Sequence, residues 1–511
     1  MKKRLLSAIL FLSFCLVGLW AKEDIRIINP VLPGDRPDPS IIKIDGVYWA
    51  AATSNEWSPL FPIFKSKDMQ NWELVNYVFP GGAPEWALNN FWAPELSYDE
   101  KQKKVYLYYT ARVKSSNRLA CAVAVADSPM GEFTDLGPLV AQEPGSIDAF
   151  EMRDENGKLY LLWKEDGNSM GLPTHMWAQQ MTEDRTRLTG EMHSLFYNDT
   201  PWEEGLVEGI CVTKKNGYFY ALYSAASCCD KRCNYKTGVA RSKTLLGKWE
   251  KYEKNPILVD NADWRCPGHG TLVEKDGKQY YLYHAYNRTG SVYVGRQGVL
   301  EELFWGEDGW PYFKNDVKYD RLNTSLDFED NFKGKTLNAL WQWRVTQTIH
   351  YTTGKKGLEL GASTDNRDLG TLLVQPIKSL NFTATIDTRR STSYAGIGII
   401  GGAHNGFGAP LAGIGVSVKG GRVEVWKTVD GNSATLAESP MDISEIARIR
   451  MIVRDGYKLD FEYLNDGGWI SLAKRVDASS YVPWGMGFRI GLCAKGEDGT
   501  YANFRKISLI H

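Results

Sequence analysis

The most constraining feature of this chain is a short strand signal that occurs five times at nearly constant spacing. The five segments read IDGVYWAAAT, KKVYLYYT, ENGKLYLLW, KNGYFYALYS and KDGKQYYLYH, with tyrosines at Tyr48, Tyr106, Tyr160, Tyr220 and Tyr280. The steps between these tyrosines are 58, 54, 60 and 60 residues. A unit of that length holds about four short strands, which bury their faces only against neighbouring units. The repeat therefore predicts an all-β fold that begins with a five-bladed β-propeller.

One polar residue precedes each of these tyrosines by ten to twelve positions. These residues are Asp38 in RPDPS, Glu95 in WAPEL, Asp148 in SIDAF, Glu208 in LVEGI and His269 in GPGHG. Any one of them alone is equally well read as a loop or capping residue. If each blade begins at the axis with this segment, however, the equivalent offsets predict one central cavity rich in carboxylates.

Composition limits the class of ligand that such a cavity would hold. The 511 residues are 43% hydrophobic and 12% aromatic, which is typical of well-cored globular domains. A formal net charge of -1 gives no field for a polyanion, so we expect no nucleic-acid partner. The 18 Trp and 26 Tyr favour sugars, whose apolar ring faces stack on aromatic side chains.

The first 21 residues, MKKRLLSAILFLSFCLVGLWA, have the basic start, short apolar stretch and small final residue of a secretory signal peptide. We therefore expect an exported, periplasmic protein without a membrane span in the mature chain. A lipid anchor on Cys15 is the alternative, although Phe14 occupies a position where a small residue is usual.

The composition changes after the repeat, which covers residues 24–322. From residue 326 to residue 511, alternating apolar segments separated by Gly, Asn and Asp turns predict a concanavalin-like β-sandwich. The expected strands are FTATIDT, AGIGII, GIGVSV, RVEVWK, RIRMIVRD, KLDFEYL, FRIGLCA and FRKISLI. Gly396, Gly398 and Gly401 in GIGIIG match a dinucleotide-binding string, but the helix that such a loop needs does not follow.

Seven cysteines remain after the predicted signal peptide, so they cannot all pair within the chain. The cluster SCCDKRC, residues 227 to 233, is compatible with a short disulfide in an oxidising compartment or with reduced thiols. A zinc site is disfavoured because a second Cys or His pair at ligand spacing is missing.

Several carboxyls in one pocket suit glycosidic bond cleavage with inversion. One carboxylate must deprotonate the attacking water, while a carboxylic acid must protonate the leaving oxygen. A third nearby anion disfavours ionisation of the acid and so helps it keep its proton. The candidates from separate repeats provide such a set.

The motifs RPDPS, WAPEL, SIDAF, LVEGI, GPGHG and YVGRQGVLEELFWGEDGWP together resemble glycoside hydrolase family 43, the arabinofuranosidase and xylosidase type. The resemblance spans the first domain and implies a five-bladed propeller followed by a β-sandwich. It implies that Asp38 is the general base, that Asp148 tunes and orients the acid, and that Glu208 is the general acid.

The same resemblance implies further site residues. Arg296 in YVGRQ would bind the sugar and contact nearby acids, while Trp92 and Trp57 would form aromatic walls of the pocket. His269 resembles a histidine that helps to hold a structural calcium or another cation at the propeller axis. A single imidazole makes only a loose site for calcium, and the chemistry itself requires no cofactor.

These expectations describe an exo-acting, inverting hydrolase that releases terminal α-L-arabinofuranosyl residues from plant cell wall oligosaccharides or polysaccharides. The alternatives are a β-D-xylosidase on the same scaffold, a non-catalytic sugar-binding propeller and a retaining furanosidase. The sandwich either closes one side of the pocket or acts as an independent carbohydrate-binding module. The sequence leaves the oligomeric state open.

Overall fold

The computed structural model describes residues 27–315, 325–364, 369–402, 411–441 and 446–511. The predicted signal peptide lies outside these residues. In the described ranges nearly all regular secondary structure is strand, with one short helix, α1 (Ser291–Val294), and three 3-10 turns, η1 (Gly167–Met170), η2 (Pro201–Glu203) and η3 (Ser479–Tyr481). A helix long and apolar enough to span a membrane is not found in the part of the chain that the structure describes.

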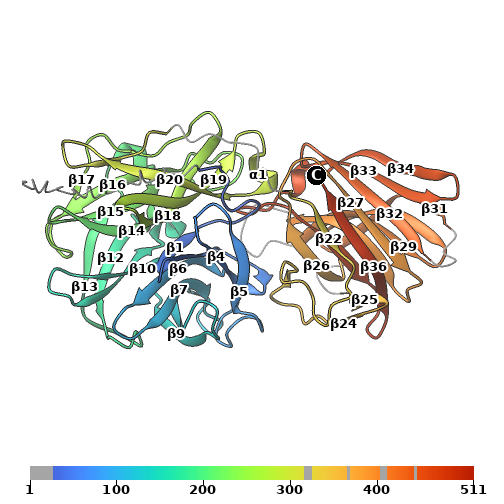
Figure 1. The fold of residues 1–511 in the computed structure, drawn as a ribbon, viewed down its shortest axis with the longest axis horizontal. Coiled ribbons are helices and arrows are strands. Elements are labelled where there is room, and N and C mark those ends of the chain that lie inside the picture. The colour runs from blue at the N-terminus through green and yellow to red at the C-terminus, as the bar shows by residue number, and fades with distance from the viewer. Residues whose placement is uncertain (1–26, 316–324, 365–368, 403–410, 442–445) are drawn as a thin grey trace, which may run out of the picture.

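The first domain consists of five four-stranded antiparallel sheets, which are the predicted blades (Figure 1). Blade one contains β1 (Ser40–Ile44), β2 (Val47–Ala51), β4 (Leu60–Ser66) and β5 (Glu73–Phe79). Blade two contains β6 (Trp92–Asp99), β7 (Lys104–Arg112), β8 (Leu119–Ala126) and β9 (Thr134–Val140). Blade three contains β10 (Ser146–Arg153), β11 (Leu159–Glu165), β12 (His175–Met181) and β13 (Leu188–Tyr197).

Blade four contains β14 (Val207–Lys215), β15 (Tyr218–Ala225), β16 (Lys236–Ser242) and β17 (Glu250–Lys251). Blade five contains β18 (Trp264–Lys275), β19 (Lys278–Asn287), β20 (Gln297–Trp305) and β21 (Pro311–Tyr312). The first strands of the blades, β1, β6, β10, β14 and β18, contact one another in a closed ring. A bridge between Leu32 and Gly298 joins the N-terminal segment to blade five and helps to close that ring.

The aligned tyrosines of the repeat all lie in the second strand of their blade and are buried. In a strand, successive side chains point to opposite faces, and both faces of a blade are covered by its neighbours. The second strands therefore carry nearly continuous apolar residues, as in VYLYYT and YFYALYS. This pattern is what made the repeat visible in the sequence.

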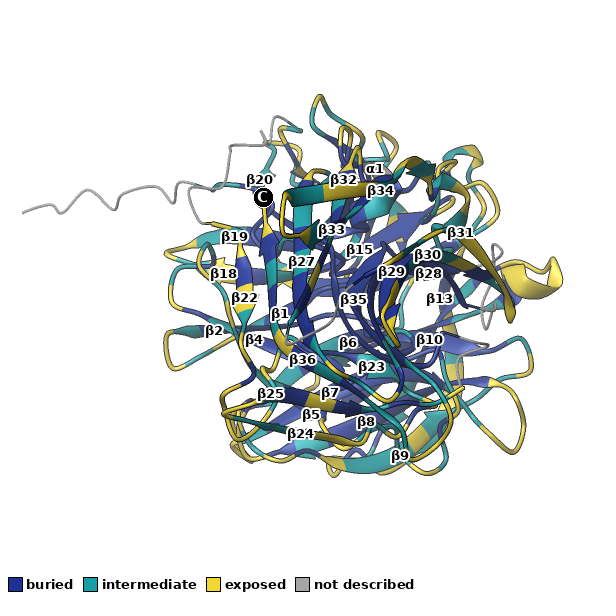
Figure 2. Ribbon diagram, turned by 90° about the vertical axis from the view of Figure 1, so that its right-hand side faces the viewer, coloured by how far each residue is buried: buried dark blue, intermediate teal, exposed yellow. Residues whose placement is uncertain are grey.

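The second domain is a β-sandwich of two antiparallel sheets, as predicted. One sheet contains β22 (Phe328–Asp330), β24 (Tyr351–Gly354), β25 (Gly357–Gly361), β27 (Phe382–Arg389), β32 (Ala447–Arg454), β33 (Lys458–Asn465), β34 (Gly468–Asp477) and β36 (Tyr501–Ile510). The other has the order β26 (Thr371–Pro376), β35 (Arg489–Lys495), β28 (Tyr394–Gly402), β29 (Leu411–Lys419), β30 (Arg422–Val429) and β31 (Asn432–Pro440). Figure 2 shows buried strands inside and exposed residues along the edge strands β31 and β34.

The two domains are joined by several kinds of contact. β23 (Trp343–Arg344), which lies between β22 and β24 in the chain, pairs with β3 (Trp57–Ser58) of the propeller. Arg489 Nη1 lies 3.0 Å from Asp35 Oδ2, and both side chains are buried. Trp57 packs in one apolar cluster with Leu372, Val374 and other sandwich residues. The sandwich is therefore docked on the propeller, as one of the two predicted arrangements requires.

Candidate active site

A cavity of about 600 Å³ opens where the blades and the sandwich meet. Its walls include the three predicted catalytic carboxyls, which come from three different blades. His269 and Arg296 of blade five and Trp92 of blade two line it as well. Other lining residues are Thr53, Arg112, Lys164, Asp166, Cys228, Cys229, Trp484, Gly485 and Met486.

Unusual backbone conformations aim these side chains into the cavity. Asp38, Asp148 and His269 have φ angles of 51°, 58° and 45°, in the left-handed region that non-glycine residues rarely adopt. The strands that contain Asp148 and His269 are also bulged at these positions. Such residues cost about 1 to 3 kcal/mol each and concentrate at functional sites. These strained backbone conformations lower the stability of the fold, and they direct the polar side chains into the cavity.

Gly209, directly after Glu208, has a φ of 62° at the equivalent bulge of blade four. A Cβ atom there would lie 2.8 Å from Cγ of His269, which is closer than real Cβ contacts allow. Its N–H donates a 3.0 Å hydrogen bond to Asp148 Oδ2. Glycine at this position therefore lets blades three, four and five converge.

Asp38 is held in its ionised form by several partners. Arg296 Nη1 donates to Asp38 Oδ1 at 2.9 Å, and Thr53 Oγ1 donates to Asp38 Oδ2 at 2.7 Å. Burial alone would raise the pKa of Asp38, but the Arg296 charge and nearby histidines hold this pKa well below its usual range. His284, whose Nδ1 accepts the Asp38 N–H, has its pKa lowered to about 4 by burial and by Arg296. Asp38 is thus a carboxylate at neutral pH.

Glu208 is bound by a lysine and a tyrosine. Lys164 Nζ lies 2.8 Å from Glu208 Oε2 and 3.0 Å from Asp166 Oδ1, and Tyr235 donates its hydroxyl to Glu208 Oε1 at 2.8 Å. Burial opposes ionisation of Glu208, yet Lys164 and Tyr235 together lower its pKa. In the free cavity these contacts favour the charged form of Glu208.

Asp148 shows the opposite behaviour. Burial raises its pKa to about 6, and the negative charges of Glu208 and Asp38 act in the same direction against the pull of His269. Because the charge of Glu208 raises the pKa of Asp148, the two carboxyls titrate as an interacting pair. The free cavity favours the proton on Asp148, whereas the family resemblance implies that Glu208 donates it. Substrate binding would have to move that proton between the two carboxyls.

Arg296 links this chemistry to the second domain. Besides its contact with Asp38, its Nε and Nη2 donate to the carbonyl oxygen of Gly485 at 3.2 and 2.9 Å. Trp484, Gly485 and Met486 belong to the sandwich and line the cavity. The sandwich therefore closes one side of the pocket and helps to fix the guanidinium on Asp38.

The aromatic predictions have different outcomes. Trp92 lines the cavity and donates its indole N–H to Asn55 Oδ1 at 2.9 Å. Trp57 instead lies in the domain interface, where it is 6% exposed and has Arg344 and Arg489 near its ring. Trp57 belongs to a strand that pairs with the sandwich, a long-range partner that the local sequence does not reveal. The pocket role predicted for Trp57 therefore has no support in its position.

Glu95 also departs from the simple picture of five inward-facing residues. It accepts a 2.8 Å hydrogen bond from Thr271 Oγ1, on the first strand of another blade, and burial raises its pKa to about 8. The left-handed residue of its strand, β6, is Ala93, two positions earlier. Glu95 therefore serves the packing between blades near the axis.

His269 Nδ1 lies 3.5 Å from Asp38 Oδ1 and 3.9 Å from Asp148 Oδ2, and the backbone N–H of His269 donates to Ser224 Oγ. Among the residues whose placement is described, groups of three or more His, Cys, Asp or Glu side chains suited to a metal ion are not found. The contacts of His269 are thus those of a neighbour of the two aspartates, and its role as a cation ligand stays a prediction.

The sequence did not reveal several residues in or behind the cavity wall. Lys164 lies at the end of the apolar run LYLLWK of β11. A lysine in a buried strand could have indicated a carboxylate partner in the site. No sequence pattern pointed to Tyr235 or His284.

Two disulfides, Cys228–Cys229 and Cys233–Cys266, resolve the pairing that the sequence left open, and the first of them lines the cavity. Cys121, Cys211 and Cys493 are free and buried.

Comparison with known proteins finds relatives of this chain. Xylosidase/arabinosidase 43B of Humicola insolens is 28% identical over 310 residues, which are 57% of this chain and 55% of that protein. The extracellular exo-alpha-(1->5)-L-arabinofuranosidase ArbA of Cellvibrio japonicus is 27% identical over 288 residues, 50% of this chain and 80% of that protein. The chain thus spans about half the length of the first of these curated relatives.

Among solved structures, xylan beta-1,4-xylosidase of Bacillus halodurans C-125 superposes with a TM-score of 0.78 at 18% identity, covering 95% of this chain and all of that one. This likeness supports the propeller and sandwich architecture alone. The model of glycosyl hydrolases family 43 matches residues 27–311, which contain all three carboxyls and more than half of the chain. The chain therefore belongs to glycosyl hydrolases family 43.

Proposed function

We propose that this chain is an exo-acting, inverting glycoside hydrolase that removes terminal α-L-arabinofuranosyl residues from plant cell wall glycans. The observation that carries the proposal is the convergence of Asp38, Asp148 and Glu208 from three blades on one cavity that the sandwich closes on one side. A pocket with walls from both domains suits a terminal sugar better than the interior of a polymer.

In the proposed reaction, Asp38 accepts a proton from the water that attacks the anomeric carbon. The Arg296 charge and the Thr53 hydroxyl keep Asp38 ionised for this purpose. Glu208 gives its proton to the leaving glycosidic oxygen, as the acid of an inverting pair does. Asp148, with a pKa near 6, is the reservoir from which Glu208 is protonated.

Lys164 makes this exchange feasible because it has two carboxylate partners. Its ammonium group contacts Glu208 and Asp166 at 2.8 and 3.0 Å. When Glu208 takes up the proton, the charge of Lys164 remains compensated by Asp166. A substrate that displaces water from the cavity further favours the neutral form of Glu208.

A β-D-xylosidase is the second candidate. It is favoured by the names of similar proteins, which include Xylosidase/arabinosidase 43B of Humicola insolens. Rates on 4-nitrophenyl α-L-arabinofuranoside and 4-nitrophenyl β-D-xyloside rank the two. We expect the arabinoside to be hydrolysed faster, and a clear preference for the xyloside would reverse the order.

Stereochemistry separates both candidates from a retaining furanosidase. Proton NMR of the first-formed sugar should show the anomer opposite to that of the substrate. Initial release of the same anomer would exclude the inverting mechanism. Release of no sugar from either pentoside would instead leave the non-catalytic, sugar-binding propeller.

Export is part of the proposal. It rests on the signal-peptide pattern of residues 1–21 and is consistent with the two disulfides, which persist in oxidising compartments. Fractionation of cells that express the full chain should place the protein outside the cytoplasm, and its recovery only from the cytoplasm would contradict export.

A further inference from the structure

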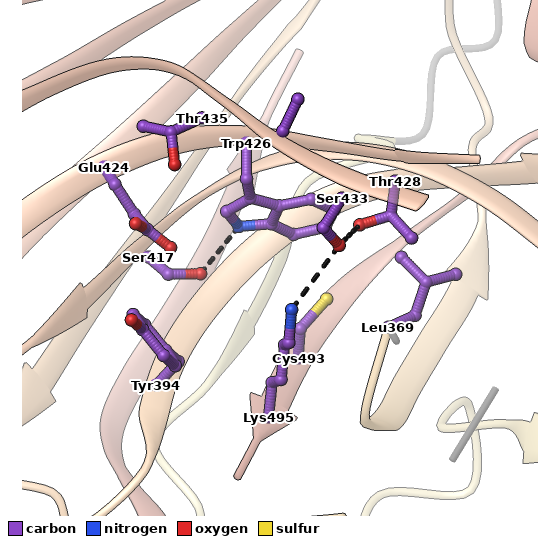
Figure 3. A pocket seen from close by; sticks show the side chains of 11 residues that line it. Leu369, Tyr394, Ser417, Glu424, Trp426, Thr428, Ser433, Thr435, Cys493 and Lys495 are labelled. Carbon is purple, nitrogen blue, oxygen red and sulfur yellow. Dashed lines mark hydrogen bonds between the residues drawn. The ribbon is translucent and has the colours of Figure 1, made fainter. Parts of the chain in front are cut away.

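A second cavity lies on the sandwich, on the outer face of the six-stranded sheet (Figure 3). Its volume is about 180 Å³, below the 300 Å³ or more of pockets for drug-sized ligands, so it fits a ligand of about one ring. The lining residues are Leu369, Tyr394, Ser417, Glu424, Trp426, Thr428, Ser433, Ala434, Thr435, Cys493 and Lys495.

Glycines on two neighbouring strands explain how this cavity arises, and one of them, Gly398, belongs to the string that mimicked a dinucleotide-binding motif. Gly398 of β28 and Gly415 of β29 face it, while the intervening positions fill the sandwich core. A Cβ atom on Gly415 would lie 2.5 Å from Cζ2 of Trp426, and one on Gly398 would lie 3.2 Å from Cη2 of the same ring. The glycines therefore leave room for the Trp426 indole to extend across two neighbouring strands.

The Trp426 ring is fixed in this position. Its indole N–H donates to Ser417 Oγ at 2.7 Å, and the ring packs against the apolar cluster at the domain interface. Leu369 and Cys493 belong both to that cluster and to the cavity wall. The aromatic surface is thus preorganised, and the cavity adjoins the interface with the propeller.

The polar groups around the ring indicate the class of ligand. Glu424 and Lys495 place one acid and one base on the wall, so the cavity favours neither a polyanion nor a polycation. The hydroxyls of Thr428 and Ser433 lie 2.7 Å apart, and Lys495 Nζ donates to Ser433 Oγ at 3.4 Å. A neutral sugar ring combines an apolar face for the indole with hydroxyls for such donors and acceptors.

We propose that this cavity is a second carbohydrate-binding site, which holds one neutral pentose ring of a cell wall polysaccharide against Trp426. The identity of the sugar rests on the proposed function, whereas the existence of the site does not. The site would keep the polymer beside the propeller while terminal residues enter the catalytic cavity.

The test measures retardation of the full chain in native gels that contain arabinoxylan, in a Glu208→Gln background so that the polymer is not cut. We expect Trp426→Ala to weaken binding about fivefold or more. Trp469→Ala is the matched control, because Trp469 is also half-buried and lies on β34 of the other sheet. It should bind like its parent.

Thr435→Trp covers the case in which Trp426→Ala fails to fold. Thr435 is exposed on the edge strand β31, so a large side chain there would obstruct the cavity without emptying the core. We expect the same loss of retardation. Unretarded parent protein, parent-like binding by Thr435→Trp, or equal losses in Trp426→Ala and Trp469→Ala would overturn the proposal. Hydrolysis of nitrophenyl pentosides by the unmodified chain tests the proposed function separately.

Discussion

The propeller cavity and the sandwich cavity differ in how their charged groups are surrounded. In the propeller, Asp38 and Glu208 are paired with the almost fully buried cations Arg296 and Lys164. In the sandwich, Glu424 and Lys495 are only partly buried beside an aromatic ring. The first cavity shifts carboxyl pKa values in opposite directions, and the second offers mainly shape and hydrogen bonds.

The difference follows from architecture. Neighbouring strands of one sheet lie about 4.8 Å apart and project their side chains side by side, so groups on a sheet face do not converge on a point. In the propeller, strands of separate sheets meet around an axis and direct side chains toward a common centre. Convergence places acids and bases within a few ångström in a desolvated space, which acid-base catalysis requires.

The largest expected effect concerns the assignment of the acid. Glu208→Gln should lower hydrolysis of arabino-oligosaccharides about 1,000-fold, within the usual range for loss of a general acid. A dinitrophenyl arabinofuranoside, whose leaving group needs no proton, should recover most of that loss. Glu329→Gln, an exposed sandwich residue paired with Lys506, is the control and should behave like the parent.

Asp148→Asn should also slow hydrolysis of arabino-oligosaccharides, and the dinitrophenyl substrate should recover part of that loss, because the expected role of Asp148 is to tune the proton donor. If the activated leaving group rescued Asp148→Asn and left Glu208→Gln inactive, the two roles would have to be exchanged. That result would agree with the pKa pattern of the free cavity.

The contact between the two regions is the next test. Arg489→Met should lower the free energy of unfolding by about 3 kcal/mol, because it leaves the buried Asp35 carboxylate without its ionic partner. Urea denaturation measures this loss. Arg454→Met removes an exposed member of a sandwich ion pair and should cost less than about 1 kcal/mol. Equal losses of unfolding free energy in the two variants would show that the buried ion pair at the domain interface contributes no more stability than an exposed one.

The Glu95 carboxyl should make the stability of the propeller depend on pH. Its folded pKa of about 8 lies above its unfolded value, so the native state binds the extra proton between about pH 4.5 and 8. Stability should therefore fall by about 2 to 4 kcal/mol as pH rises through that window. Urea denaturation at several pH values should show that Glu95→Gln removes this part of the loss. An unchanged pH dependence in Glu95→Gln would contradict the assignment.

The smallest effect is expected for Lys164. Lys164→Met should slow hydrolysis about tenfold and raise the pKa values of Glu208 and Asp148, both of which Lys164 lowers. Because the acid must be protonated, the alkaline limb of the pH profile should move up by about one pH unit. Lys164→Arg should restore most of the limb's position. A limb that stayed in place would reduce Lys164 to a structural role.

Much of the fold was predictable because its signals are local and repeated. The tyrosine-centred strands indicated the blades, and alternating apolar residues indicated the sandwich strands β27 to β30, β32, β33, β35 and β36. Three carboxyls were found because each stands at a similar offset from a repeated strand. Trp57 was misplaced because its environment is set by a strand pairing almost 290 residues away in the chain.

The sequence alone determined where many strands lie along the chain, the division into a propeller and a sandwich, and the polar residue with which each blade begins. Strand periodicity and repeat length are properties of residues that are close in the chain. Only the tertiary structure decided that Lys164 would meet Glu208, that Arg296 would join Asp38 to Gly485, and that glycines would make room for Trp426. These outcomes depend on desolvation and on distances between groups far apart in the chain. Such quantities exist only once the blades have closed and the sandwich has docked.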